Sequence, residues 1–214
     1  MLNSSKDTIK KMAWLNKKKN MQSLTHLQVQ KFLYFYEMFQ KASGKEYDFD
    51  SLKAYANGPV FGKVYGDIAY REPEVLEAID KVEDIEIDEK SAEEALFTIN
   101  SMTDTELSSL THLFDMWNSK SDRINAGEHH IPIRESDITE RDIDLVKTII
   151  PSYPIDNPNY HTIVIQNKRF IVSEQDFKNL TDIHYGTLEL LSNEEELINP
   201  VYLSIEEDGG LLVD

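Results

Sequence analysis

The amino-acid sequence predicts a mainly α-helical protein with a small α+β extension. Three observations lead to this prediction. Apolar residues recur at helical spacing through most of residues 1–150, helix-capping residues precede several of these runs, and the composition changes at Pro151. We therefore expect a multi-helix, bundle-like all-α domain over residues 1–150 and a hairpin-containing α+β domain over residues 151–214.

The first two predicted helices carry most of the expected core. Residues 6–18 predict a helix because apolar residues follow one face of it: Ile9, Met12, Ala13 and Leu15. Thr25 and Gln28 then form a capping box in front of the run LQVQKFLYFYEMFQK. A helix that is apolar on most sides lies in a core, so we expect this one to be the central packing helix rather than an aromatic cofactor site. Ser43-Gly44 ends it.

The stretch AYANGPVFGKVY, residues 54–65, places a Gly-Pro pair between two apolar runs. Pro59 suits the first position of a helix and Gly58 can adopt the non-helical angles of a cap, so we expect a helix to begin at Pro59. Pro73 opens a further short helix. The acidic stretch at residues 83–89 predicts a loop.

Three more capping residues introduce the remaining helices of this domain. Ser91 forms a capping box with Glu94, and Thr103 forms one with Glu106. A continuous helix is then predicted through residues 107–117, with its apolar side chains facing the core. Thr139 caps the last helix.

The extension begins with the proline-rich stretch PSYPIDNPNY, which predicts a stiff connector or irregular loop. Two β-branched runs flank Asn167-Lys168 and predict a hairpin. Ser173 caps a short helix. A second hairpin follows, with Asp208-Gly209-Gly210 in its turn.

Charge is unevenly distributed along the chain. The net charge is −17, with +6 in residues 1–63 and therefore −23 in the remainder. This excess provides either solvated surface or an acidic face for a basic partner, and it disfavours nucleic-acid binding. Cysteine is absent, which excludes disulfides and thiolate chemistry. We expect a cytoplasmic protein, because no signal peptide or membrane span is predicted.

Catalytic and metal-binding patterns are scarce. His129-His130 is the only histidine pair, and a metal there would need Glu128 or Asp137 as well; we predict no metal and no cofactor. Thr111, His112, Asp115 and Trp117 could line a cleft in which Asp115 orients His112. The alternative places His112 at the edge of an ordinary core helix. We predict no enzymatic activity, with a hydrolase that uses His112 and Asp115 as the remaining alternative.

Two stretches, in this order, resemble the Panacea domain, also called the SocA-like antitoxin domain. LTHLQVQKFLYF (24–35) is similar to its opening helix, and LKAYANGPVFGKVYGDI (52–68) is similar to its second signature. The matching positions are Gln30, Lys31, Leu33, Tyr34, Ala54, Tyr55, Gly58, Pro59, Val60, Val64 and Tyr65. The segment 106–117 resembles a later family helix with different spacing, and residues from about 155 resemble nothing known to us.

The resemblance implies an all-α domain of bacterial and prophage toxin–antitoxin pairs. We therefore expect a protein-binding module that neutralises a cognate, basic protein toxin by direct binding, with residues 155–214 as a specificity element. The resemblance also leaves open an adaptor that delivers a toxin to a Clp-type protease. A phage or mobile-element protein that counters a host defence is a further alternative. The Gly58-Pro59-Val60 turn is expected to be structural.

Overall fold

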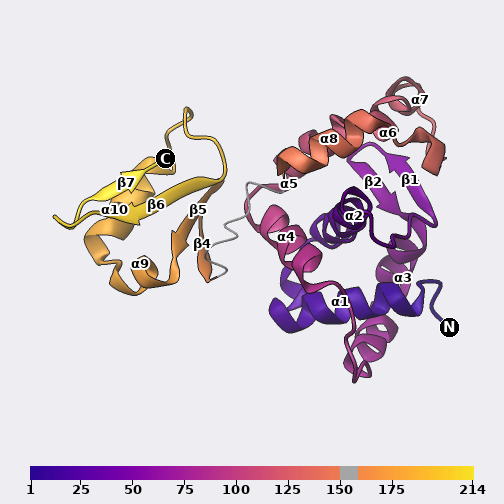
Figure 1. Ribbon diagram of the computed structural model, residues 1–214, viewed down its shortest axis with the longest axis horizontal. Coiled ribbons are helices and arrows are strands. Elements are labelled where there is room, and N and C mark those ends of the chain that lie inside the picture. Colours follow the sequence, from indigo (N-terminus) through magenta and orange to yellow (C-terminus); the bar gives the residue numbers. More distant parts are fainter. Residues whose placement is uncertain (150–158) are drawn as a thin grey trace.

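The computed structural model describes residues 1–149 and 159–214. The protein is mainly helical: helices take up 54% of it and two small sheets 15%. Figure 1 shows two parts, which we call the N-terminal part (residues 1–149) and the C-terminal part (residues 159–214). The predicted boundary at Pro151 and most of the proline-rich connector lie outside the described residues. No helix within 1–149 or 159–214 is long and apolar enough to cross a membrane.

The central helix of the N-terminal part is α2 (His26–Ala42), as predicted. Both hydrogen bonds of the Thr25–Gln28 capping box are present, and every residue from 29 to 40 is buried. In Figure 1, α2 lies in the middle of this part, surrounded by α1 (Lys6–Lys18), α4 (Glu89–Asn100) and α8 (Glu140–Ile149). Trp14 of α1 stacks on Phe32 with ring centroids 5.9 Å apart.

The prediction of an all-α domain is wrong, because the N-terminal part contains a three-stranded sheet. Its strands are β1 (Leu52–Tyr55), β2 (Gly58–Phe61) and β3 (Ile131–Pro132), in the order β2-β1-β3. Gly58-Pro59 therefore begins a strand, and the helix predicted at Pro59 starts at Gly62 instead. Pro59 is tolerated because β2 is an edge strand, where a missing N–H leaves no partner unpaired.

Two further predicted helix boundaries differ, and a third is close to the prediction. Helix α3 (Gly62–Asp80) consists of two helical stretches joined at a kink at Arg71, whose φ and ψ are not helical, so the second stretch begins just before Pro73, near the predicted start. Helix α4 starts two residues before Ser91, because Asp88 is the cap and accepts a hydrogen bond from the Ser91 N–H. The continuous helix over 107–117 is broken into α5 (Asp104–His112) and α6 (Asp115–Asn118).

Other predicted caps are confirmed. Thr103 and Glu106 form their capping box at the start of α5. Thr139 accepts a hydrogen bond from the Asp142 N–H at the start of α8. Residues 83–88 form the predicted acidic loop. Three short helical segments complete this part: η1 (Met21–Ser23), α7 (Ser121–Asn125) and η2 (Glu135–Asp137).

The C-terminal part is a four-stranded sheet with two helices. Its elements are β4 (Tyr160–Ile165), β5 (Lys168–Ser173), α9 (Glu174–Asn179), α10 (Asp182–Leu191), β6 (Val201–Ile205) and β7 (Leu211–Val213). Both predicted hairpins, β4–β5 and β6–β7, are confirmed, as is the Ser173 cap. The strand order is β4-β5-β6-β7, with β5 and β6 parallel. Helix α10 was not predicted.

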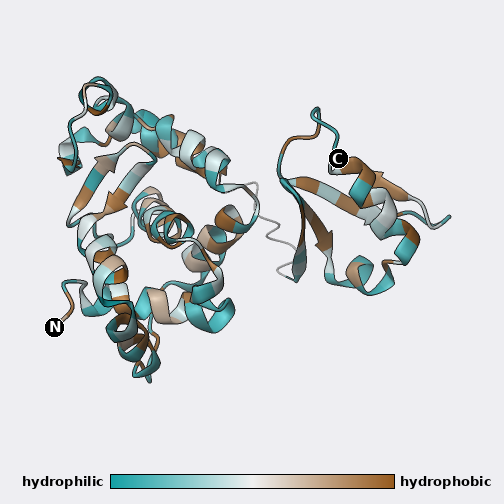
Figure 2. Cartoon of the chain, turned by 180° about the vertical axis from the view of Figure 1, so that it is seen from behind, coloured by the Kyte–Doolittle hydropathy of each residue, from teal (hydrophilic) through white to brown (hydrophobic). Residues whose placement is uncertain are grey.

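Each part has its own hydrophobic core. The core of the N-terminal part is built within residues 1–149, whereas Phe170, Val172, Leu188, Val201 and Leu203 form the core of the C-terminal part. Hydrophobic positions recur along the helices and strands of both parts (Figure 2). The described contacts between the parts are few. Asn199 Nδ2 donates to the Glu106 carboxylate at 2.9 Å, and the rings of Phe97 and Tyr160 lie 5.0 Å apart.

Candidate functional site

Several of the predicted signature residues are core residues. Leu33, Tyr34, Ala54 and Val64 are at most 3% exposed. The Tyr34 hydroxyl donates to the Met116 sulfur at 3.6 Å, and burial raises the pKa of this phenol well above its usual value. These residues hold α2 against the sheet and α6, so they position a site rather than form one.

Lys31 is an exception, because it carries a charged group into this core. It is 1% exposed, and its ammonium donates to the Asn57 carbonyl at 2.8 Å and to Thr111 Oγ1 at 2.9 Å. Among the residues described, no carboxylate forms an ion pair with it. Burial without a counter-charge lowers the pKa of Lys31 to about 7.

Gly58 allows Lys31 and Thr111 to approach the hairpin. Its φ is +101°, a left-handed conformation that favours glycine. A β-carbon at this position would lie 2.2 Å from Lys31 Nζ and 2.3 Å from Thr111 Oγ1. The expectation that the Gly58-Pro59 turn is structural therefore has a specific basis: the turn accommodates the buried lysine.

The break between α5 and α6 brings His112 and Trp117 together. In a continuous helix these side chains would point about 140° apart. Instead the rings stack, with centroids 3.7 Å apart and planes 13° apart. Trp117 Nε1 donates to the Tyr55 carbonyl at 2.8 Å, and the His112 ring hydrogen-bonds the Ala56 backbone. Burial, and secondly the Lys31 charge, lower the pKa of His112.

Asp115 does not join this group. Its carboxylate accepts a hydrogen bond from Thr139 at 2.8 Å and pairs with Arg141, so it ties α6 to the start of α8. His112 is held by Ala56 and Trp117 instead. Asp115 therefore does not orient His112 in the described structure, although a hydrolase that uses both residues requires this contact.

A cleft opens beside the buried lysine. Its volume is about 260 Å³, and the residues that line it come from α2, the β1–β2 hairpin and α3: His26, Leu27, Gln30, Lys31, Tyr55, Ala56, Asn57, Val60 and Tyr65. Five of these are signature residues, so the structure brings Gln30, Lys31, Tyr55, Val60 and Tyr65 to one site. We call it the hairpin cleft.

The residues considered for a metal at the histidine pair have other partners. His129 and His130 are exposed, and His130 contacts Tyr55 through a ring contact and a hydrogen bond. Glu128 pairs with Arg123, and Asp137 pairs with Lys120. No group of three or more potential metal ligands occurs within residues 1–149 and 159–214.

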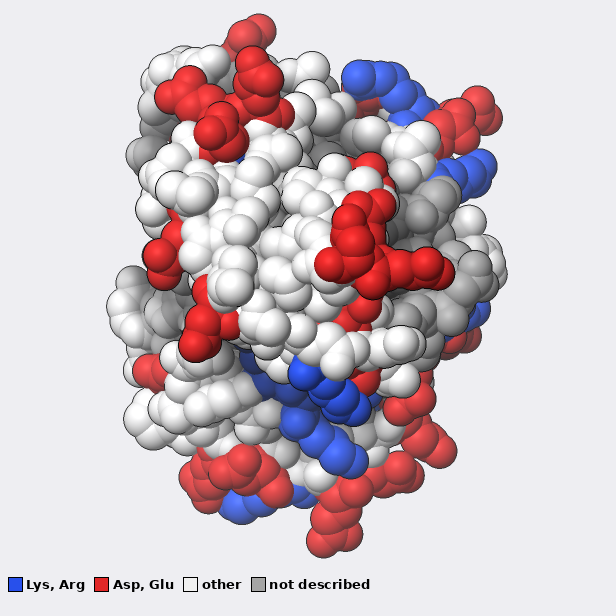
Figure 3. Space-filling view, turned by 90° about the vertical axis from the view of Figure 1, so that its left-hand side faces the viewer, with Lys and Arg blue, Asp and Glu red and all other residues white. Residues whose placement is uncertain are grey.

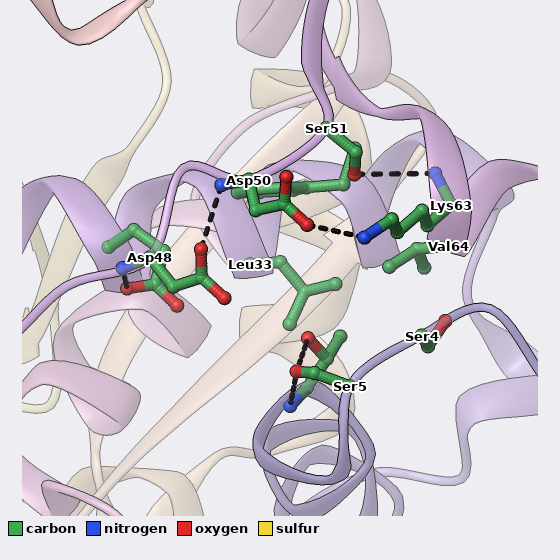
Figure 4. A pocket seen from close by; sticks show the side chains of 11 residues that line it. Ser4, Ser5, Leu33, Asp48, Asp50, Ser51, Lys63 and Val64 are labelled. Atoms are coloured by element: carbon green, nitrogen blue, oxygen red, sulfur yellow. Dashed lines mark hydrogen bonds and ion pairs between the residues drawn. The ribbon is translucent and has the colours of Figure 1, made fainter.

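A second hollow lies where the N-terminal segment meets the loop before β1 (Figure 4). Its volume is about 30 Å³, enough for a water molecule but not for an organic ligand. The polar groups around it bond to one another: Asp50 pairs with Lys63, and the Asp48 N–H donates to Glu37 at 2.8 Å. We assign this hollow a structural role.

The C-terminal part presents an apolar surface that the sequence did not reveal. Ile183 and Leu190 of α10 are 80% and 73% exposed, and they share a helix face with Gly186 and Thr187. We call these four residues the α10 face. A hollow of about 540 Å³ continues from Ile183 and Thr187 toward the turn of β6–β7. The signal that could have predicted α10 is its run of apolar residues on both sides of the helix.

Acidic side chains border this end of the molecule. Figure 3 shows a broad uncharged area with acidic groups along most of its edge and a smaller basic cluster below. Residues 159–214 contain eleven Asp or Glu and three Lys or Arg, a net charge of −8. An uncharged area inside a charged border matches the depletion of charged residues at the centre of a protein–protein interface.

In comparisons with known proteins, no family model, no curated protein and no solved structure matches this chain. The resemblance to the Panacea domain therefore stays a hypothesis that rests on the residues quoted above.

Proposed function

We propose that this protein is an antitoxin-type binding module that neutralises a basic protein toxin by direct binding. The observation that carries the proposal is the α10 face, whose two large aliphatic side chains are mostly exposed on a part of the chain with a net charge of −8. Aliphatic side chains that share one helix face can anchor a partner, because burial against it removes them from water.

The acidic border defines the chemistry of the partner. Acidic groups at the rim of an interface attract a basic protein and accelerate encounter, while the apolar centre provides the contact that persists. The N-terminal part then acts as the scaffold, in keeping with its continuous core around α2. This division agrees with the expectation that residues 155–214 confer specificity.

The test is co-expression with the protein encoded by the neighbouring gene, which the proposal requires to be basic. We expect the neighbour to arrest growth alone, and the full chain to restore growth and to co-purify with it as a stable complex. Ile183→Asp and Leu190→Asp should abolish both effects, since each places a carboxylate in the apolar centre. Tyr70→Asp is the matched control, because Tyr70 is 82% exposed on α3.

Two outcomes would overturn the proposal. One is a neighbour that is harmless or is not rescued by the full chain. The other is rescue by the two α10 variants as efficiently as by the parent, which would leave the α10 face without a role.

A further inference from the structure

Gln30 lines the hairpin cleft and has a buried hydrogen-bond donor that no described residue accepts from. Gln30 is 3% exposed, and its Oε1 accepts a hydrogen bond from the Phe61 N–H at 2.8 Å. This bond fixes the orientation of the carboxamide. The Nε2 group at its other end is buried and finds no partner in the described parts of the chain. Buried amide donors are nearly always bonded, so this one, on a residue that lines the cleft, is available to an acceptor atom bound there.

Lys31 supplies a second donor at the same place. An ammonium has three N–H groups, and Asn57 and Thr111 accept two hydrogen bonds from it. The third has no acceptor among the residues described. Lys31 also lacks the carboxylate partner that a buried lysine ordinarily has. Both donors therefore favour a ligand that accepts hydrogen bonds and carries negative charge.

The walls of the cleft are apolar and aromatic. Leu27 and Val60 line it together with Tyr55 and Tyr65, whose ring centroids lie 5.9 Å apart. None of its lining residues is acidic. Its volume of about 260 Å³ lies just below the range of roughly 300–1,000 Å³ found for sites of drug-sized molecules. Such a cleft accommodates a single group the size of one large side chain.

We propose that the hairpin cleft binds an organic carboxylate with an attached apolar group. The carboxylate accepts hydrogen bonds from Lys31 Nζ and Gln30 Nε2, and the apolar group packs on Leu27, Val60 and the two tyrosines. A single cation and an amide match a monoanion better than a phosphate dianion, whose extra charge would remain unpaired. The carboxylate belongs either to a free acid or to the C-terminus of a peptide. This site is separate from the α10 face, so each can fail alone.

The first experiment compares an acid with its amide on the full chain at pH 6.5. We titrate 3-phenylpropionate and 3-phenylpropionamide and follow backbone amide signals by NMR. The acid should bind saturably, with shifts confined to residues 26–31 and 55–65, and at least tenfold more tightly than the amide. Equal binding of the two compounds, or no saturable binding of the acid, would overturn the proposal.

Lys31→Met and Lys41→Met form a matched pair on α2. Lys41 bonds to Tyr47 at 2.7 Å, outside the cleft, so its loss should leave affinity unchanged. Lys31→Met should weaken binding of the acid at least tenfold and leave binding of the amide nearly unchanged. An unchanged affinity for the acid would contradict the proposed contact, and the acid–amide comparison on the parent chain decides the matter if this variant does not fold.

The pH profile provides a separate readout. The titratable groups around Lys31 are His112 of α5, Tyr55 of β1, Tyr65 of α3 and His26 of α2. Because binding needs the ammonium and the pKa of Lys31 is about 7, affinity should fall up to about tenfold per pH unit above 7. Titrating a short peptide that ends in a free phenylalanine carboxylate then distinguishes the sources. Tighter binding than that of the free acid identifies a protein C-terminus, and weaker binding a small molecule.

Discussion

The ammonium of Lys31 fills the space that a β-carbon on residue 58 would need. A β-carbon on residue 58 would lie 2.2 Å from Lys31 Nζ. The φ of Gly58, +101°, is also unfavourable for any residue with a side chain. Residue 58 and residue 31 therefore depend on each other: the buried lysine reaches the hairpin only because a glycine is there.

We expect Gly58→Ala to destabilise the fold by about 3 kcal/mol, from left-handed strain together with the clash. Gly58→Val should cost at least as much. Urea unfolding followed by circular dichroism measures the change. Gly66→Ala is the matched control: Gly66 lies in α3, and a β-carbon added there would meet no atom within 4 Å. It should stabilise the protein by about 0.5–1 kcal/mol. A Gly58→Ala variant as stable as the parent would show that the hairpin can move away from Lys31.

Stability should rise with pH above neutrality because of Lys31. Its pKa is about 7 in the folded state and near 10.5 in the unfolded chain, so between these values the unfolded state binds more protons. The free energy of unfolding therefore increases as pH rises from 7 toward 10, by about 2 kcal/mol over the first two units. Unfolding curves at pH 7 and 9 measure this rise.

Lys31→Met removes the titrating group and should remove most of that increase. At pH 7 and below we expect the methionine variant to match or exceed the parent in stability, since no ammonium is left buried without a counter-charge. Identical pH profiles for the parent and Lys31→Met would mean that Lys31 is hydrated and keeps an ordinary pKa.

Sequence reasoning succeeded where local rules decide the structure. Several features depend only on residues that are close in the chain, and these were predicted correctly. They are the Thr25–Gln28 and Thr103–Glu106 capping boxes, the apolar run of α2 and both hairpins of the C-terminal part. The Gly58-Pro59 pair led to the wrong prediction of a helix start at Pro59. Proline is tolerated both at a helix start and on an edge strand, because neither position needs a backbone N–H. Pairing with β1 decides between them, and that pairing is a tertiary contact.

The candidate site was predictable in part for the same reason. Thr111, His112 and Trp117 were predicted to line one cleft and Lys31 was matched as a signature residue, but the sequence did not indicate that Lys31 meets the other three at one turn. That meeting needs the break after His112, where the exposed Leu113 faces water instead of the core position that helical periodicity assigned to it. Asp115 was included by its spacing from His112, and its contacts with Thr139 and Arg141 could not be read from that spacing.

A fragment of residues 1–149 should fold on its own. Its core shares no residue with the core of the C-terminal part, and the Asn199–Glu106 hydrogen bonds and the Phe97–Tyr160 ring pair that join the parts lie outside both cores. We expect a cooperative thermal transition within a few degrees of that of the full chain, followed by circular dichroism at 222 nm. A fragment without a cooperative transition would mean that the C-terminal part completes the core.

Salt should act on the formation of the toxin complex more than on its breakdown. Screening shortens from about 8 Å at physiological ionic strength to about 3 Å at 1 M, so the net charge of −8 on residues 159–214 loses its reach toward a basic partner. We expect the association rate to fall at least about tenfold over this range, while the dissociation rate changes much less.

Ile183→Asp and Leu190→Asp should show the opposite pattern, with faster dissociation at every salt concentration, because they remove apolar contact rather than charge. Surface-binding kinetics of the parent, both variants and the Tyr70→Asp control separate these effects. If association is insensitive to salt, the acidic excess only solvates the protein; if the α10 variants dissociate like the parent, the toxin binds elsewhere on the chain.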